Sequence, residues 1–488
     1  MQSYDYIIVG GGPSGLSTAW LLARYGFTSL IIERNEVIGG CHRVKRVDGL
    51  FTEHGPRIYS STYKMFITLL ADMGLDFYQL FTPYNFNISH IGQQSARNMT
   101  WSELYHFAMA YIRMFFDPTY GKKISMSEFM NQNHFSSSTR LYIDRLCRLT
   151  DGADVRNYTL YQFFQLLNQQ ILYQLYQPVE PNDEGLFRHI TDALKRTHKI
   201  DILLAHEVIR IDQSNSLINN ITIKNLETNQ LRNIPIKNLI LAVPPKPMVK
   251  LITSSNISNP FKIINLEKWA MSNSYFDYIP ITFHWKHKLT LPKIWGFPSS
   301  DWGIAFVVLS DYFKDDSKGI ISTAITSPDN ISRTTGKTAH QSTSAELITE
   351  VFRQLRLAFP TLPFYTKAII SPNVYHHNGK WIDRDTAFVQ TPNAEFIDYQ
   401  SPVYSNLCTV GTHNGKSLYN FTSMESAVTN AFGLIHQIIP KSKTEFPIQR
   451  THTLNEIIII MGIILVFAVV LYQWVHKGGL KNMSQRVQ

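Results

Sequence analysis

The chain has 488 residues, which is too long for one hydrophobic core and predicts two to three domains. Its hydrophobic content of 44%, with 12% aromatic residues, is typical of a folded globular protein. Three cysteines without a CxxC pair exclude a disulfide framework and a cysteine-based metal site, and they fit a reducing compartment. The formal charge of +9 is spread along the chain without an arginine-rich arm, so no nucleic-acid partner is expected.

The N-terminal stretch predicts a phosphate-binding unit. Residues 5–9 (DYIIV) are typical of a short buried strand, residues 10–15 (GGGPSG) of a tight turn, and residues 16–25 of a helix with one apolar face. Glycine permits the sharp turn and lets the backbone approach a pyrophosphate, and the free N–H groups at the helix N-terminus attract the anion. The residues predicted to hold the phosphates are Gly10, Gly12, Pro13, Ser14 and Gly15.

A second predicted strand, residues 29–32, ends at Glu33. This acid lies close to the expected distance of about twenty residues after the last glycine of the turn, where a carboxylate accepts hydrogen bonds from the ribose hydroxyl groups. An acid at this place disfavours a 2′-phosphate and therefore NADP.

The segments that follow Glu33 resemble a flavoprotein superfamily. Gly39-Gly40 resembles the second signature of flavoproteins with two dinucleotide-binding domains, where a second close backbone approach holds the FAD diphosphate. Residues 53–57 (EHGPR) resemble the segment along the flavin in the amine oxidase, protoporphyrinogen oxidase and phytoene desaturase superfamily. Many members have arginine where this chain has Cys41, which leaves Arg43 as a displaced phosphate contact. The resemblance implies these FAD contacts: Arg34, Gly39, Gly40, Arg43, Gly55, Pro56 and Arg57.

An inserted substrate domain is expected next. Residues 63–72 predict a helix and residues 85–90 a strand, and residues 100–176 are mostly helical by pattern and rich in aromatic residues. The aromatic residues between 101 and 116 could line a channel or dip into a membrane, but aromatic residues at helical spacing are more often core. We therefore expect this stripe to be buried.

From Asp183 the pattern returns to that of a nucleotide-binding domain and then to a second part of the substrate domain. In the resembled superfamily a strand valine touches the adenine ring, as Val208 would here, and a later strand ends in Ala-Val-Pro-Pro, as residues 242–245 do. The predicted helices are residues 185–196 and 344–358, and the predicted strands are residues 206–212, 221–224, 231–236, 239–243, 278–285, 304–309 and 319–326.

Residues 406–438 resemble the C-terminal FAD motif of the superfamily. Residues 407–410 predict a strand, Gly411 a turn, and residues 422–425 a capping box that opens a helix. In the family the N-terminus of this helix points at the pyrimidine edge of the flavin and stabilises the negative charge that reduction creates. The resemblance implies Gly411, Met424 and Glu425 as FAD contacts.

Residues 457–475 (IIIIMGIILVFAVVLYQWV) carry no charged residue and are long enough to cross a hydrocarbon core about 30 Å thick. Tyr472 and Trp474 suit a membrane interface, and basic residues follow. Because no signal peptide is visible, we expect a single-pass C-terminal anchor, with a short tail of residues 476–488 and a cytosolic catalytic body.

The expected fold class is α/β: a Rossmann-like FAD-binding domain of the two-dinucleotide-binding-domain flavoprotein type, with an inserted α+β substrate domain and a C-terminal transmembrane helix. The segments predicted for the FAD-binding domain are residues 1–85, 184–270 and 395–440. Those predicted for the substrate domain are residues 86–183 and 271–394. Residues 441–456 are expected to be a linker.

The resemblance implies a membrane-anchored FAD-dependent oxidoreductase. Such an enzyme removes a hydride from a C–N or C–C bond of a small organic substrate and passes the electrons to oxygen, a quinone or another acceptor. No cysteine stands where relatives attach the flavin covalently, so the FAD should be noncovalent. The seventeen histidines are scattered without a metal-ligand pattern. Residues that could lie near the flavin ring are Arg57, Tyr59, Trp381, His413 and Tyr419.

The substrate and two alternative functions remain open. The anchor makes a lipophilic substrate, such as a porphyrin, isoprenoid or sterol, a hypothesis. Ser423 stands where amine oxidases with an aromatic cage have tyrosine, which puts amine oxidation in doubt. One alternative is a non-redox flavin-dependent isomerase of the UDP-galactopyranose mutase type, whose motifs resemble residues 55–59 and 419–424. The other is a non-catalytic membrane adaptor with a flavoprotein fold, as in Rab escort proteins, against which the intact glycines and Glu33 argue.

Overall fold

The first strand of the chain lies in the middle of a parallel sheet that gathers segments from both ends of the sequence. The computed structural model describes residues 3–85, 97–276, 278–293, 300–385, 387–417, 419, 423–451 and 453–484. In it, β1 (Tyr6–Val9) pairs with β2 (Ser29–Ile32) on one side and with β12 (Asn238–Leu241) on the other. With β8 (Ile200–Leu203) and β21 (Leu407–Thr409) the strand order is β21-β12-β1-β2-β8. All five strands are parallel, so their carboxyl ends meet at one edge.

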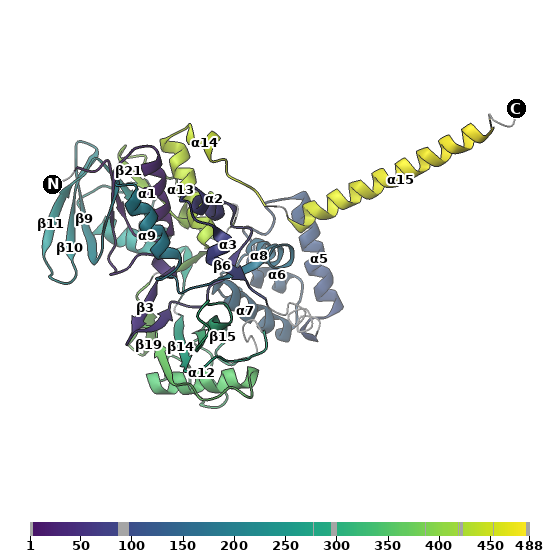
Figure 1. Ribbon diagram of the computed structural model, residues 1–488, viewed down its shortest axis with the longest axis horizontal. Helices are drawn as coiled ribbons and strands as arrows, with labels where there is room; N and C mark the ends of the chain where they lie inside the picture. Colours follow the sequence, from purple (N-terminus) through teal and green to yellow (C-terminus); the bar gives the residue numbers. More distant parts are fainter. Residues whose placement is uncertain are drawn as a thin grey trace.

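The apolar strands of this sheet are covered on both faces. On one face Ile8 and Ile31 share a core with helices α1 (Pro13–Arg24), α2 (Lys64–Asp72), α9 (Leu186–Arg196) and α13 (Met424–Ile438). On the other face lie α10 (Pro245–Thr253) and an antiparallel sheet of β9 (His206–Ser214), β10 (Leu217–Asn225) and β11 (Leu231–Pro235). Figure 1 shows these layers at the N-terminal side of the molecule.

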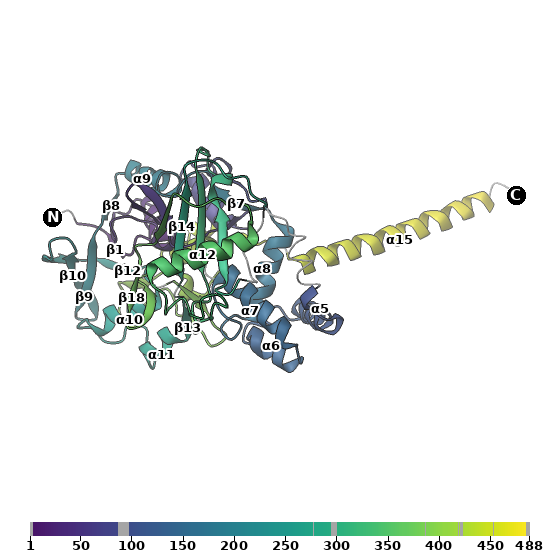
Figure 2. The same ribbon diagram turned by 90° about the horizontal axis from the view of Figure 1, so that it is seen from below.

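A second, antiparallel sheet forms the core of the remaining body. Its central strand β14 (Ile279–Trp285) is buried over its whole length, and the strand order is β15-β16-β14-β17. Helix α12 (Ser344–Ala358) packs against this sheet, as Figure 2 shows. The other strands are β15 (Ile304–Val308), β16 (Gly319–Ile325) and β17 (Lys367–Ile370). His284 of β14 lies 2.9 Å from the Phe51 carbonyl oxygen, which ties this sheet to the N-terminal segment.

Four helices form a separate group on the side of this sheet. They are α5 (Trp101–Phe116), α6 (Met126–Gln132), α7 (Ser137–Asp151) and α8 (Leu160–Leu172). Phe107, Phe129 and Phe164 meet in their shared core. Capping boxes at Thr100, Ser125 and Thr159 fix the starts of three of these helices, because each side chain accepts a hydrogen bond from a backbone N–H that the helix leaves free.

Shorter elements connect these parts. They are η1 (Gly40–His42), β3 (Val44–Val47), β4 (Leu50–Glu53), β5 (Tyr59–Ser60), α3 (Phe77–Leu80), β6 (Phe81–Pro83), β7 (Leu175–Pro178), α11 (Leu266–Met271), β13 (Asn273–Tyr275), η2 (Leu309–Asp311), β18 (Val374–His377), β19 (Lys380–Asp383), β20 (Phe388–Gln390), η3 (Thr412–Asn414) and α14 (Ser442–Glu445).

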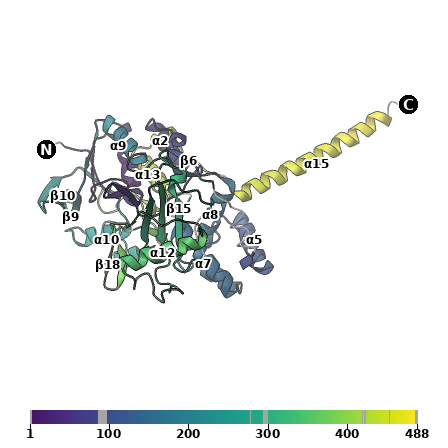
Figure 3. The ribbon, with the colours of Figure 1, turned by 60° about the horizontal axis from the view of Figure 1, so that its bottom comes forward.

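The last helix, α15 (Leu454–Ser484), projects from the body beside α5, as Figure 3 shows. Within the part of the chain that the structure describes, no helix reaches the length and apolarity that a membrane crossing requires.

Most predicted elements are confirmed. The strand at residues 29–32 and the helix at residues 344–358 have the predicted bounds. The mostly helical character predicted for residues 100–176 is also confirmed, although β7 begins at Leu175. The strand predicted at 85–90 falls almost wholly on residues outside those described. The burial predicted for the aromatic stripe of α5 is wrong for part of it, because Trp101, Tyr105 and Phe116 are exposed.

The predicted capping box at residues 422–425 is also wrong. Ser423 does cap α13, since its side chain accepts a hydrogen bond from the Ser426 N–H. Glu425 does not reach back to the cap, however. Its buried carboxylate accepts hydrogen bonds of 2.9 Å from the backbone N–H groups of Met65 and Phe66, and so caps the neighbouring helix α2.

We predict that Glu425→Ala lowers the free energy of unfolding by about 2–4 kcal/mol, because it leaves two buried N–H groups at the start of α2 without acceptors. The matched control is Asp76→Ala, which removes the exposed side-chain cap of α3 and should cost about 1 kcal/mol or less. Urea denaturation of both variants tests this difference. Equal losses would contradict the structural role of Glu425.

Candidate functional site

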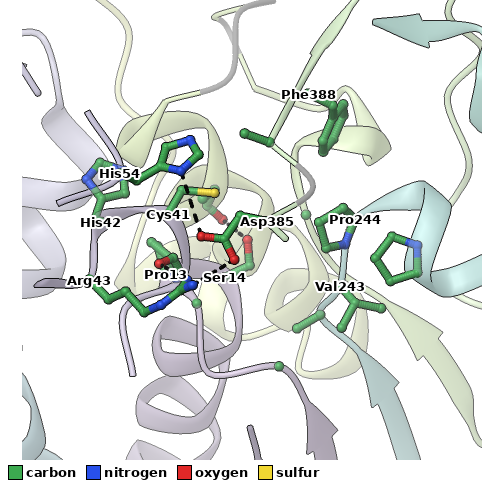
Figure 4. A pocket seen from close by; sticks show the side chains of 18 of the residues that line it. Pro13, Ser14, Cys41, His42, Arg43, His54, Val243, Pro244, Asp385 and Phe388 are labelled. Atoms are coloured by element: carbon green, nitrogen blue, oxygen red, sulfur yellow. Dashed lines mark hydrogen bonds and ion pairs between the residues drawn. The ribbon is translucent and has the colours of Figure 1, made fainter. Parts of the chain in front are cut away.

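A cavity of about 880 Å³ opens at the carboxyl edge of the parallel sheet. The ends of β1, β2 and β12 border it through Val9, Ile32 and Ala242. The first residues of α1 and the N-cap residue of α13, Ser423, reach it as well. Figure 4 shows Pro13 and Ser14 of α1 on the same side as Arg43 and Asp385, with Val243 and Pro244 across from them. The cavity therefore lies where open α/β sheets bind their ligands.

The glycine turn after β1 has the predicted close packing. Gly10 has φ +111°, and a Cβ there would meet the Ala242 carbonyl oxygen at 2.5 Å. A Cβ on Gly15 would meet the Gly10 carbonyl oxygen at 2.0 Å. Gly12 is the N-cap of α1 without a side-chain hydrogen bond, and Pro13 occupies the first turn. The N-terminus of α1 thus meets the cavity with backbone N–H groups that can donate hydrogen bonds to an anion.

Glu33, predicted to bind the ribose, follows β2 and lines the cavity. Its Oε2 accepts a hydrogen bond of 2.7 Å from the Gly11 N–H, and its Oε1 accepts one of 2.9 Å from the Asn35 N–H. Oε1 also accepts a hydrogen bond of 2.6 Å from the Asn35 side chain. These bonds fix the carboxylate beside the turn, and Oε2 retains a lone pair for a further donor. This arrangement can bind the hydroxyl groups of a ribose.

The second glycine pair packs directly on the first turn. The Gly39 N–H donates to the Gly11 carbonyl oxygen at 2.8 Å, and both Gly39 and Gly40 have positive φ angles. A Cβ on Gly40 would lie 3.2 Å from the Gly12 Cα, whereas one on Gly39 would run into the Phe187 ring. Gly40 therefore lines the cavity and Gly39 stands behind it as support.

One end of the cavity is formed by β9 and α10. Val208, predicted to contact the adenine ring, lines it together with Glu207, Lys246 and Lys250. Ser423 and Ala427 of α13 also line the cavity, as do Gly411 and His413 after β21. Burial lowers the pKa of His413 to about 3, so this imidazole is neutral at pH 7, and its Nε2 lies 2.8 Å from the Thr409 hydroxyl.

A buried charge network forms part of the wall. Arg43 donates to the Asp385 carboxylate at 2.7 Å and to the Gly40 carbonyl oxygen at 2.8 Å. His54 Nδ1 lies 2.8 Å from Asp383 and 3.8 Å from Asp385. Burial would raise the pKa of Asp385, but the charges of Arg43 and His54 hold it below its usual range. Figure 4 shows Asp385 between the two basic side chains.

His54, Asp383 and Asp385 also have the spacing of metal ligands, since their donor atoms lie within 4.8 Å of one another. The Arg43 guanidinium already occupies one oxygen of Asp385, and the Asn373 side chain donates to the other at 3.3 Å. The group is therefore better suited to an ion network than to a metal ion. The sequence did not predict this group because its members lie far apart in the chain: His54 follows β4, Asp383 ends β19, and Asp385 lies in the loop after β19.

The cavity combines basic groups with an apolar end. Its charged lining residues are Arg34, Arg43, Arg57, Lys246, Lys250, Glu33, Glu207 and Asp385. Arg57 donates to the Cys41 carbonyl oxygen at 2.8 Å. The apolar and aromatic lining away from the glycine turn comprises Leu149, Phe276, Tyr278, Ala305, Ala324 and Phe388. Phe276 and Tyr278 are stacked, with ring centroids 5.3 Å apart.

Several predicted residues lie outside this lining. Met424 and Glu425 are buried behind the start of α13, so Glu425 serves α2 as described above. Tyr59 is fully buried, with its hydroxyl 3.0 Å from His42 Nδ1. Trp381 lies in the core against α12 and donates to the Ser342 carbonyl oxygen. The Tyr419 hydroxyl lies 3.2 Å from that of Thr451. Of the candidates for the flavin ring, Arg57 and His413 line the cavity.

Comparisons with known proteins agree with a nucleotide-binding unit at the N-terminus. Residues 8–72 match the model of the NAD(P)-binding Rossmann-like domain. The chain is 36% identical over 75 residues to putrescine oxidase of Kocuria rosea, which covers 15% of the chain and 16% of that enzyme. It is 27% identical over 168 residues to UDP-galactopyranose mutase of Mycoplasma pneumoniae, which covers 34% of the chain and 38% of that protein. The chain thus spans well under half the length of these two relatives.

The likeness of the fold extends much further. Cyclohexylamine oxidase of Brevibacterium oxydans superposes with a TM-score of 0.59 at 14% identity, over 90% of this chain and 100% of that chain. The chain therefore has the α/β Rossmann-like fold of the amine oxidase-like flavoproteins.

We predict that Asp385→Asn lowers the free energy of unfolding at pH 7 by about 3–5 kcal/mol, because it leaves the buried Arg43 guanidinium without its partner. The folded-state pKa of Asp385 is depressed, so its contribution is present above the ordinary value of 3.8 and is lost as the pH falls through and below that value. Urea denaturation at pH 7 and below pH 4 should show that the difference in the free energy of unfolding between wild type and variant is smaller at the lower pH.

The control is Asp183→Asn, whose partner Arg46 is partly exposed at the surface. This change should cost about 1 kcal/mol or less. A loss at pH 7 as small as that of the control would show that the Arg43–Asp385 pair contributes little.

Proposed function

We propose that the protein is an oxidoreductase that holds FAD noncovalently in this cavity and oxidises a small organic substrate. One observation carries the proposal: the N-termini of α1 and α13, from opposite ends of the chain, open into the same glycine-lined space. Two helix N-termini provide partial positive charge at two places, as a ligand with an anionic diphosphate and a reducible ring requires. The comparisons support the same class.

The residues proposed to hold FAD divide by position. Gly10, Gly12, Ser14 and Gly40 would face the diphosphate, because all four line the cavity where α1 begins and Gly40 packs directly against Gly12. Glu33 would bind the ribose, Val208 would contact the adenine ring, and the N-terminus of α13 at Ser423 would face the flavin. When bound, FAD supplies the acceptor for the hydride that leaves the substrate.

The cavity favours a neutral or anionic substrate with an apolar body. Its apolar end has Leu149, Phe276 and Phe388 where a substrate would lie, and its charged lining contains more basic than acidic groups. Asp385, an acid of that lining, is already paired with Arg43. A polycation such as a polyamine would meet five arginine and lysine side chains. Of the three lining acids, Glu33 accepts hydrogen bonds from backbone N–H groups and Asp385 is paired, which leaves Glu207. His54 and Arg57, both in the wall, are available to orient an oxygen atom of the substrate.

We further propose that the protein is attached to a membrane through residues 457–475. The sequence of this segment and the exposed apolar side chains of α15, including Ile463, Leu465 and Phe467, support the proposal. Replacing Ile464 and Phe467 together by aspartate should abolish flotation of the full chain with phosphatidylcholine–phosphatidylserine vesicles, because each charge costs about 2–4 kcal/mol in hydrocarbon. Leu357→Asp, at an exposed position of α12, is the control and should float like wild type. Flotation of the double variant would refute attachment through α15.

A second function is favoured by one specific observation. The stretch similar to UDP-galactopyranose mutase and the basic lining of the cavity suit a nucleotide sugar, whose diphosphate needs cations. The two functions differ in the fate of the flavin. An isomerase converts its substrate without net reduction of the flavin, whereas an oxidoreductase leaves it reduced in the absence of an acceptor.

The deciding measurement is the visible absorbance spectrum of the purified chain during anaerobic addition of porphyrinogens, isoprenoids, putrescine and UDP-galactopyranose. We expect flavin bands that bleach with a neutral or anionic apolar compound and persist with putrescine. Rapid bleaching by putrescine would overturn the substrate class. Conversion of UDP-galactopyranose without bleaching would establish the isomerase, and a chain that cannot be loaded with FAD would overturn both functions.

We predict that Glu33→Gln weakens FAD binding about 10–100-fold, because the neutral amide loses charge-assisted hydrogen bonds to the ribose. Glu36→Gln, three residues further on at an exposed position, is the matched control and should bind FAD like wild type. Titration of each apoprotein with FAD, followed by flavin fluorescence, measures both affinities. Unchanged binding in Glu33→Gln would remove Glu33 from the ribose site.

A further inference from the structure

Helix α5 presents an apolar face to the outside of the molecule. Its exposed large side chains follow one another at steps of three or four residues and so share one side of the helix. They are Trp101 (88% exposed), Tyr105 (60%), Met109 (45%), Ile112 (49%) and Phe116 (78%). A surface helix normally turns polar side chains outward, so this pattern is the reverse of the usual one.

Helix α5 is held firmly in place, so its outer face stays exposed. A capping box of Thr100 and Glu103 holds its start, and the Glu103 carboxylate also accepts a hydrogen bond of 2.7 Å from the Ser136 N–H of the neighbouring segment. On the inner side, Phe107, Ala110 and Tyr111 pack in the core shared with α6 to α8. The helix therefore cannot turn its outer residues inward without giving up this core.

The chain segment that contains α5 is mostly basic. Between residues 97 and 123 the chain carries Arg97, Arg113, Lys122 and Lys123, and the exposed acid is Asp117, since Glu103 is buried. The Arg113 guanidinium lies over the Tyr120 ring, 4.3 Å from its centroid, which keeps it at the end of the apolar stripe. Such a rim is complementary to the phosphate groups of an anionic lipid surface.

The position of α5 indicates which surface it meets. The start of α15 contacts α5, and Figures 2 and 3 show the two helices at the same end of the body. Exposed apolar side chains continue along α15 from Ile458 to Val470. If α15 enters a bilayer, α5 is the part of the body held next to the headgroups.

We infer that the outer face of α5 lies in the interfacial layer of an anionic membrane, with Trp101, Tyr105 and Ile112 between the headgroups and the acyl chains. This inference rests on the proposed attachment through residues 457–475 and adds a second contact that fixes the orientation of the body. Aromatic and aliphatic residues on one helix face, with basic residues around them, are the features of helices that lie in this layer.

The orientation has a consequence for the cavity. Cys147 of α7 packs in the same core as the inner side of α5, and Leu149 of α7 lines the cavity. The helical wall of the cavity is thus the wall nearest the membrane, which suits a substrate dissolved in lipid.

The test uses the full chain with an environment-sensitive fluorophore on single introduced cysteines. Tyr105→Cys and Met109→Cys report on α5, Ile463→Cys on α15, and Leu357→Cys on α12 as the control, all at exposed positions. The labelled wild-type chain measures any reaction of the native cysteines. Each protein is mixed with vesicles of phosphatidylcholine alone or with added phosphatidylserine. We expect a blue shift of emission at 105, 109 and 463, larger on α5 with phosphatidylserine, and none at 357.

Other outcomes separate the two proposals. A blue shift at 463 with none at 105 and 109 overturns the role of α5 and leaves attachment through α15 standing. No shift at any position overturns both. A shift at 105 and 109 that appears without vesicles and grows with protein concentration assigns the face to a second copy of the chain, and so overturns the membrane contact. As a further check, Trp101→Ser combined with Ile112→Ser, both at exposed positions, should abolish most of the shift at 105, and an unchanged shift would also overturn it.

Discussion

The structure depends on one electrostatic constraint, the meeting of two helix N-termini at a common cavity. Helix α1 begins at the glycine turn after β1, and α13 begins more than four hundred residues later. The two helices pack side by side, and Ser14 of α1 lies within hydrogen-bond distance of the Ala427 carbonyl oxygen at 3.3 Å. Free N–H groups at such ends are costly to bury without an acceptor. An anionic ligand in the cavity would relieve this cost at both helix ends.

The second part of the body adds a wall to this cavity, and buried charges join the two parts. Arg43, after the second glycine pair, meets Asp385 from the loop after β19, and His54 contacts the same loop. A buried ion pair gives little net stability, but breaking it is expensive, so the pair fixes the position of the loop. The same loop leads to Phe388 in the apolar end of the cavity. The pairing of Asp385 with Arg43 therefore also helps to set the shape of the proposed substrate space.

Apolar side chains in unusual places indicate where the proposed substrate comes from. Inside the cavity, Phe276, Tyr278 and Phe388 form an end without free carboxylates. Outside, α5 and α15 expose large apolar residues at the same end of the body. Each pattern is costly in water and becomes favourable when a lipid-soluble molecule or a lipid surface covers it. The proposed oxidation of a lipophilic substrate accounts for both.

The sequence by itself determined the local elements and the nucleotide-binding unit. The turn at Gly10 to Gly15, the acid Glu33 and the pair Gly39-Gly40 could be identified because backbone sterics and helix dipoles act over a few residues, and these motifs are short. Tertiary structure alone decided what distant side chains do. Glu425 caps α2, Trp381 lies in a core, Asp385 pairs with Arg43, and part of the α5 stripe is exposed. Each of these outcomes depends on which distant segment packs against the residue. The pattern within one segment does not identify that partner.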